Sequence, residues 1–287
     1  MALIASLALA LHTFAASPPK RIVSLSPNVT ELLYGIGAFP QLVGVSDYCT
    51  YPPEVTKLPS VGGWRDPSLE KLASLHPDLV IIDSGQAPFV EDNFRKLGLE
   101  VLTASDHTIQ DVYNAIGALG RATGHEQEAA RLLAATRDGL ERVRQKTAPL
   151  GKPKVVLIVD RTPGTLRDLV TANGGGYLAE IVEIAGGRLA LPPSKTGYVK
   201  LSKEDLLAAD PDVILDFIHG MQSRFSGDLM EAWREMPELK AVRTGRVHEV
   251  NEDYVPHASQ RMVQTAELFA RLIHPTAPRP ERGAKMR

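Results

Sequence analysis

The residues that decide the fold are 126–146, with the sequence EQEAARLLAATRDGLERVRQK. Alanine, leucine, glutamate and arginine dominate this stretch, and all four favour an α-helix. The break Thr123-Gly124 precedes it, and the helix-breaking run Pro149-Leu150-Gly151-Lys152-Pro153 follows it. At 1.5 Å per residue the helix would be roughly 30 Å long, enough to reach from one domain to another. We expect a rigid helical connector between lobes that move little on ligand binding. The alternative is a long surface helix packed on one domain.

Short β-branched runs alternate with amphipathic helical patterns on both sides of this connector. Before it, the runs predict helices around Val29–Ile36 and Leu69–Leu75, and strands at Arg21–Leu25, Leu42–Val45, Leu79–Ile82 and Val101–Thr103. After it, they predict helices at Gly176–Ala185 and Lys203–Ala208, and strands at Lys154–Val159, Val170–Thr171, Val213–Phe217 and Val247–Val250. This alternation predicts two Rossmann-like α/β lobes with mainly parallel central sheets. A ligand cleft is expected between them, at the loops that follow the carboxyl ends of the strands.

An internal repeat supports the two-lobe interpretation. Residues 68–81, SLEKLASLHPDLVI, align without gaps on residues 202–215, SKEDLLAADPDVIL. In both copies a serine caps a short helix, an acidic residue lies in the first turn, and X-Pro-Asp leads into a buried strand. Glu70 and Glu204 therefore occupy matching places on the two lobes.

The expected domain boundaries follow from these elements. They are a leader at 1–19, a first lobe at 20–108, a helical connector at 109–150, a second lobe at 151–274 and a disordered tail at 275–287. Within the leader, residues 1–16 form an apolar run that ends in small residues, as in a secretory signal, and is too short to span a bilayer. No cysteine comes directly after the run. We expect a soluble periplasmic protein without a lipid anchor, the alternative being an apolar leader on a cytosolic protein.

Composition and motifs argue against several function classes. The net charge of −2 arises from 32 basic and 34 acidic residues that are well mixed, which argues against a nucleic-acid or membrane-surface partner. The single cysteine, Cys49, excludes an internal disulfide and a cysteine metal cluster, and the scattered histidines predict no metal site; His219 and His257 are the first to inspect. The chain lacks a Gly-x-Ser-x-Gly elbow, and the glycine run at 173–176 lacks a nucleotide-binding pattern. An enzyme that uses the cleft, with Ser24 or Ser26 as nucleophile, is a distant alternative.

Several motifs in order resemble one family of binding proteins. They are RIVSLSPNVTE at 21–31, GVSDY at 44–48, YPP at 51–53, VGGW at 61–64 and the segment at 69–81. Over roughly residues 20–274 the chain resembles the helical-backbone periplasmic binding proteins that feed ABC importers for cobalamin, ferric siderophores and haem. The resemblance implies a ligand carrier rather than an enzyme, with no cofactor of its own, and we expect a monomer.

The resemblance also implies roles for individual residues. In this family one exposed glutamate on each lobe docks on a dimeric permease, and Glu70 and Glu204 match those positions; the alternative is that both merely complement helix dipoles. The implied ligand is cobalamin or a related corrinoid, since cobalamin-binding members place aromatic rings against the corrin. The expected ligand-binding residues are Tyr51, Trp64, Tyr198, Asp253 and Tyr254.

Other ligands of the same family stay open. Tyrosines stand at positions where the cobalamin-binding members have tryptophan, and a tyrosine phenolate from Tyr51, Tyr198 or Tyr254 would ligate ferric haem. A siderophore would instead use arginines, for which Arg65, Arg224 and Arg261 are the candidates. Isolated arginines, however, are more often solvated or bridging than bound to a ligand.

Overall fold

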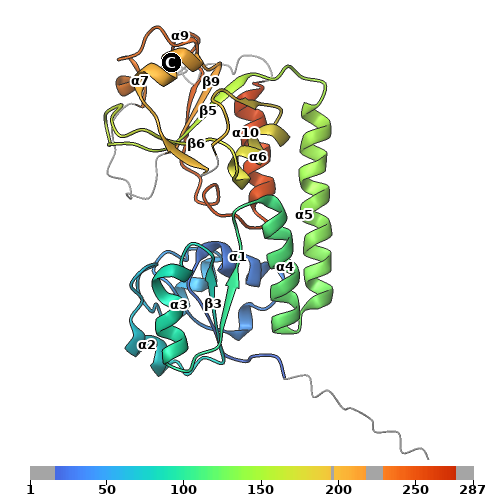
Figure 1. Cartoon of the computed structure of the whole chain (residues 1–287). Coiled ribbons are helices and arrows are strands. Elements are labelled where there is room, and N and C mark those ends of the chain that lie inside the picture. The colour runs from blue at the N-terminus through green and yellow to red at the C-terminus, as the bar shows by residue number, and fades with distance from the viewer. Residues whose placement is uncertain (1–16, 195–196, 218–228, 276–287) are drawn as a thin grey trace, which may run out of the picture.

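The computed structural model describes residues 17–194, 197–217 and 229–275. It consists of two α/β lobes, one above the other, with a long helix along one side (Figure 1). Residues 1–16 of the predicted leader, residues 276–287 of the predicted tail, and the candidates His219 and Arg224 lie outside the described residues.

The first lobe has a four-stranded parallel sheet in the order β2-β1-β3-β4. Its strands are β1 (Ile22–Ser24), β2 (Leu42–Val45), β3 (Leu79–Asp83) and β4 (Val101–Ala104). Its helices are α1 (Pro27–Gly35), α2 (Leu69–Ser74) and α3 (Ala87–Lys96), with 3₁₀ turns at Phe39–Gln41 and Pro53–Lys57; α4 (Ile109–Thr123) follows as the first helix of the predicted connector and packs on α5 (Glu126–Thr147). The four predicted strands are confirmed. Because all four run parallel, their carboxyl ends meet at one edge of the sheet.

The second lobe has a mixed sheet in the order β10-β9-β5-β6-β8, with β7 beside β5. Strands β5, β7, β9 and β10 pair in parallel, whereas β6 pairs antiparallel with both β5 and β8. The strands are β5 (Lys154–Asp160), β6 (Val170–Ala172), β7 (Arg188–Leu189), β8 (Tyr198–Lys200), β9 (Val213–Phe217) and β10 (Val247–Val250). The helices are α6 (Tyr177–Ile184), α7 (Lys203–Ala209), α8 (Leu229–Trp233), α9 (Lys240–Arg243) and α10 (Met262–Ile273). The sequence missed β7 and β8, since two or three residues are too few to reveal a period.

The long helix α5 (Glu126–Thr147) contacts both lobes. It packs closely against α1 and α10 at two glycines. A Cβ on Gly35 of α1 would lie 2.8 Å from Leu132 of α5, and a Cβ on Gly139 of α5 would lie 2.8 Å from Val263 of α10. A continuous apolar core runs from the first lobe through α4 and α5 into the second. The helix therefore bridges the lobes, and the alternative of a helix on one domain is wrong.

The predicted repeat has the same local geometry in both copies. Ser68 caps α2 and Ser202 caps α7, each by accepting the backbone N–H three residues on. The residue before each proline, His76 or Asp210, is left-handed, with φ of 44° and 38°. The following aspartates, Asp78 and Asp212, each accept a backbone N–H at the start of the neighbouring strand. The two copies thus place Glu70 and Glu204 at the second position of matching exposed helices.

Candidate ligand-binding cleft between the lobes

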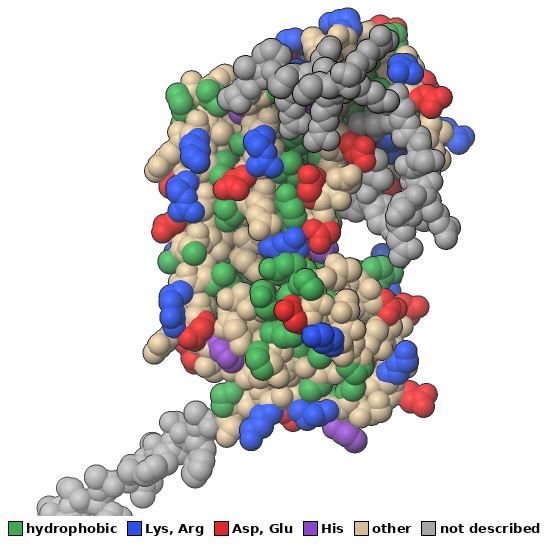
Figure 2. Space-filling view, turned by 180° about the vertical axis from the view of Figure 1, so that it is seen from behind, with side chains coloured by type: hydrophobic (Ala, Val, Ile, Leu, Met, Phe, Trp, Pro, Cys, Tyr) green, Lys and Arg blue, Asp and Glu red, His purple; other side chains and the backbone are tan. Residues whose placement is uncertain are grey.

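The carboxyl ends of the first-lobe strands face the second lobe (Figure 1). Seen from behind in Figure 2, an opening separates the lobes on the side away from α5, and acidic and basic side chains are interspersed over this face. The opening is where a ligand is expected in a two-lobed α/β protein. Three groups of side chains are candidates to line it.

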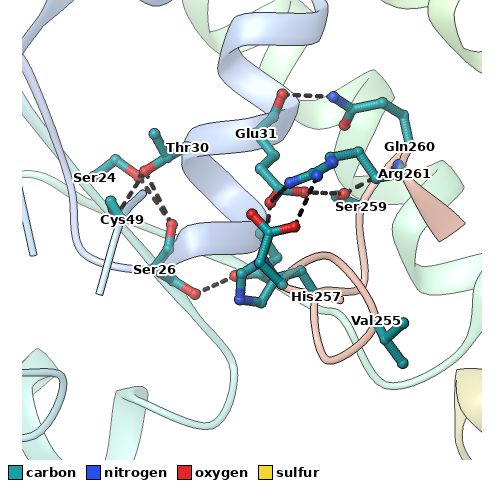
Figure 3. A network of polar contacts seen from close by, with 12 residues as sticks. Ser24, Ser26, Thr30, Glu31, Cys49, Val255, His257, Ser259, Gln260 and Arg261 are labelled. Carbon is teal, nitrogen blue, oxygen red and sulfur yellow. Dashed lines mark hydrogen bonds and ion pairs between the residues drawn. The ribbon is translucent and has the colours of Figure 1, made fainter. Parts of the chain in front are cut away.

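The first group is a polar junction between the lobes, shown in Figure 3. Glu31 of α1 is 1% exposed, and its carboxylate accepts hydrogen bonds from Arg261 at 3.0 Å, His257 at 2.8 Å and Ser259 at 2.5 Å. Its backbone carbonyl accepts from the side chain of Gln260 at 2.8 Å. All four donors precede or begin α10 in the second lobe. One carboxylate is therefore surrounded by donors from the opposite lobe.

Three of the predicted ligand residues gather around Arg261. The guanidinium carbon lies 4.2 Å from the ring centroid of Tyr51 and 5.0 Å from that of Tyr254, distances typical of cation–π contacts. A second nitrogen of Arg261 pairs with Asp253 at 3.0 Å. Burial lowers the pKa of Arg261, but Glu31 and Asp253 outweigh it and raise the pKa above its usual value. Arg261 is therefore a bridging arginine, and not one held free for an anionic chelate.

The second group surrounds Trp64, which is half-buried in the loop before α2. Its indole N–H donates to Asp83 at 2.9 Å, at the end of β3. The side chain of Gln86 donates to the carbonyls of Trp64 and Leu25, which ties the loop to the end of β1. The sequence missed Phe89, which is 46% exposed and lies 6.0 Å from the Trp64 ring. A phenylalanine that opens an amphipathic helix looks like an ordinary core position, so no sequence signal marked it.

Arg65 stacks within this second group. Its guanidinium carbon lies 4.6 Å from the Phe89 ring and 5.8 Å from the Trp64 ring. The group therefore presents two aromatic rings and a cation above the carboxyl ends of the first-lobe strands.

The third group lines a pocket of about 170 Å³ at the boundary of the lobes, where Tyr198 meets Asp106 and His107 of the segment between β4 and α4. Tyr198 begins β8 and is 53% exposed. Burial and the neighbouring Asp83 raise the pKa of Asp106 to about 6. The volume is below that of a complete small-molecule site, so the pocket suits one substituent of a larger ligand.

The serines suggested as nucleophiles are structural. Ser24 shares a 2.8 Å hydrogen bond with Thr30, and Ser26 bonds to Asn28. Neither contacts a histidine among the described residues. Cys49 lies 3.2 Å from the hydroxyl of Thr30, and burial raises the pKa of its thiol. A buried thiol of raised pKa is unreactive, so this cluster anchors the start of α1.

The two repeat glutamates lie away from the cleft. Helices α2 and α7 lie at the far sides of their lobes, remote from α5 (Figure 1). Both Glu70 and Glu204 are exposed, and neither forms an ion pair with another described residue. Both are therefore available to a partner.

The described residues form neither a membrane-spanning helix nor a metal cluster. Within the ranges given above, no helix is long and apolar enough to cross a membrane. The same ranges contain no group of three or more His, Cys, Asp or Glu side chains placed to hold a metal ion.

Comparison with known proteins settles the family. The model of a family described as "Periplasmic binding protein" matches residues 22–254. The chain belongs to the periplasmic binding protein family. It is thus a substrate-binding protein of an ABC importer rather than an enzyme, and it carries a transported ligand rather than a cofactor. Members of this family work outside the cytoplasm.

Two relatives of the chain match it over most of its length. It is 30% identical over 264 residues to YvrC, an ABC transporter substrate-binding lipoprotein of Bacillus subtilis, covering 90% of this chain and 81% of the relative. It is 27% identical over 251 residues to the vitamin B12-binding protein of Vibrio cholerae, covering 87% of each chain. Because the Bacillus relative is a lipoprotein, the expected lack of a lipid anchor stays a prediction.

Solved structures share the two-lobed fold. The periplasmic vitamin B12-binding protein BtuF of Vibrio cholerae superposes with a TM-score of 0.75 and 25% identity, over 89% of this chain and 97% of its own. The haem-binding protein RhuT of Roseiflexus sp. RS-1 superposes with a TM-score of 0.74 and 25% identity, over 90% and 100%. The fold therefore does not choose between corrinoid and haem.

Proposed function

We propose that this binding protein captures cobalamin or a related corrinoid in the cleft between its lobes and delivers it to an ABC permease dimer. The observation that carries the proposal is the placement of Tyr51, Trp64, Tyr198 and Tyr254 on both lobes beside the interlobe boundary. Aromatic faces give a flat macrocycle a large apolar contact at little cost in side-chain ordering. The identity to vitamin B12-binding proteins supports the same ligand.

Haem is the second candidate, supported by the haem-binding relative. A tyrosine phenolate can ligate ferric haem, and the exposed Tyr198 is the more accessible of the two tyrosines at the pocket. Although its side chain reaches solvent, desolvation by the pocket, followed by the nearby Asp106, raises the pKa of Tyr198 in the protein without ligand. Burial likewise raises the pKa of Tyr254. A bound ferric iron would itself lower the pKa of a tyrosine that ligates it, so the titration below decides between the two ligands.

The ligand is tested by titrating the purified protein with cyanocobalamin, haemin and a ferric siderophore. The chain has two tryptophans, Trp64 and the fully buried Trp233, so quenching must be corrected for absorption and confirmed by calorimetry. We expect saturable one-to-one binding of cyanocobalamin. Trp64→Ala should weaken it about 10- to 100-fold, the range for a central aromatic anchor, while Trp64→Phe retains most of the affinity. Saturation by haemin or the siderophore with no response to cyanocobalamin would contradict the corrinoid assignment.

The permease contact is proposed to use Glu70 and Glu204. Two carboxylates fixed on separate lobes can engage two permease subunits at once, each with charge-assisted hydrogen bonds. The test is cobalamin-stimulated ATP hydrolysis by the permease of the source organism in proteoliposomes. Glu70→Ala with Glu204→Ala should abolish stimulation without changing ligand affinity. Glu126→Ala is the control, because Glu126 is an exposed glutamate in the first turn of another helix, α5. Undiminished stimulation by the double variant would remove the docking role.

Three further properties belong to this proposal. We propose that the protein is exported to the periplasm as a soluble monomer. We also propose that its lobes have the boundaries predicted from the sequence, and that the cleft between them changes little when the ligand binds. Size-exclusion chromatography with light scattering tests the monomer, and small-angle scattering with and without ligand tests the small change in shape.

A further inference from the structure

We propose that Asp106 forms a recognition point for a neutral hydrogen-bond donor arm of the ligand, such as a carboxamide, and rejects a carboxylate arm at the same place. The inference rests on the proposed function, because it names the chemistry by which the cleft selects among macrocycles. A corrin carries amide arms, whereas haem carries carboxylate arms.

The pocket at Asp106 is built from both lobes, so it exists only where the lobes meet. Asp106 and His107 come from the first lobe, while Tyr198 and Pro256 come from the second. Three glycines, Gly174, Gly176 and Gly197, complete the second-lobe wall with backbone rather than side chains. A volume of about 170 Å³ holds an arm and not a macrocycle.

The carboxylate of Asp106 has only neutral hydrogen-bond donors among its described partners. Ser84 donates to one oxygen at 2.9 Å and Asn28 to the other at 3.1 Å. A carboxylate has about four acceptor sites, so these bonds, even with one from its own backbone N–H, leave room for a further donor. No ion pair with a described lysine or arginine balances its charge. An amide N–H from the ligand would supply the missing partner.

The groups around Asp106 decide which arm is accepted. Asp83, at the end of β3, raises the pKa of Asp106 after burial does, while His107 lowers it. From the second lobe, Tyr177 and Tyr198 face it as neutral phenols, because burial raises the pKa of each. Above about pH 6 the pocket is therefore anionic, so it attracts an amide N–H and repels a second carboxylate. Below that pH the repulsion weakens.

The wild-type protein provides the first test. It is titrated at about pH 5 and about pH 7.5, either side of the Asp106 pKa, with cyanocobalamin and with derivatives in which one peripheral amide is hydrolysed to the carboxylate. For the derivative whose changed arm enters the pocket, we expect the preference for the amide form to rise about tenfold or more between the two pH values. An equal preference at both pH values for every derivative would overturn the inference.

Asp106→Asn provides the second test. It keeps the shape but removes the charge, so the pH dependence of the preference should disappear and cyanocobalamin affinity should fall about 10-fold. Asp92→Asn, on the exposed face of α3, changes the net charge equally and should leave both unchanged. An Asp106→Asn protein that discriminates like wild type overturns the inference while the proposed function stands. Failure of wild type to bind cyanocobalamin at all overturns the proposed function as well.

Discussion

Glu31 and Asp106 are two carboxyl groups that the first lobe presents to the second, yet their surroundings differ. Glu31 is almost completely buried and is met by an arginine and further donors from the opposite lobe. Asp106 is met by neutral donors of its own lobe, lies near a second carboxylate and borders a pocket. Glu31, whose hydrogen bonds are supplied by the other lobe, holds the lobes together. Asp106, which has fewer donors, can accept a hydrogen bond from a ligand.

The largest loss of stability is expected when the charge of Glu31 is removed, because Glu31 joins the two lobes. Glu31→Gln leaves Arg261 buried without its main counter-charge, which costs about 3–5 kcal/mol for a broken buried pair. The free energy of unfolding is measured by urea denaturation, with Glu126→Gln as the exposed control. A loss below about 1 kcal/mol would mean that water or Asp253 replaces Glu31 at Arg261.

The pH dependence of stability tests whether Asp106, unlike Glu31, lacks a balancing positive charge. The folded pKa of about 6 lies above the unfolded value of 3.8, so the folded state retains its proton longer. The stabilising contribution is present in full below about pH 4 and is lost as the pH rises through about 6. Asp106→Asn should therefore match wild type near pH 4 and exceed it by about 1–3 kcal/mol at about pH 7.5. Thermal unfolding across this range measures it; a variant less stable than wild type at the higher pH would contradict the assignment.

The smallest effect on stability is expected on helices α2 and α7, which lie away from the boundary between the lobes. Glu70→Gln and Glu204→Gln change exposed side chains without ion pairs, so each should alter the free energy of unfolding by less than about 0.5–1 kcal/mol, the limit set by their helix dipoles. Circular dichroism melting curves measure the change. A larger loss would mean that these glutamates serve the fold rather than a partner.

The sequence placed two of the candidate ligand residues in loops because the relevant signals are local. Trp64 follows two glycines and Tyr254 lies in a polar segment, and both patterns indicate loops. The sequence did not reveal Arg261 as a bridging residue, since its partner Glu31 is 230 residues away. Asp106 was missed because its importance depends on burial, on Asp83 and on a pocket formed by the opposite lobe.

By itself, the sequence determined the two α/β lobes, the helix between them and the matching helices of the repeat. These features depend on hydrophobic periodicity, capping serines and proline positions, which act over a few neighbouring residues. Only the tertiary structure decided that the second sheet is mixed, that Glu31 joins the lobes and that Asp106 borders a pocket. Strand pairing, burial and charge balance depend on residues that are distant in the chain, and their free energies exist only once both lobes have come together.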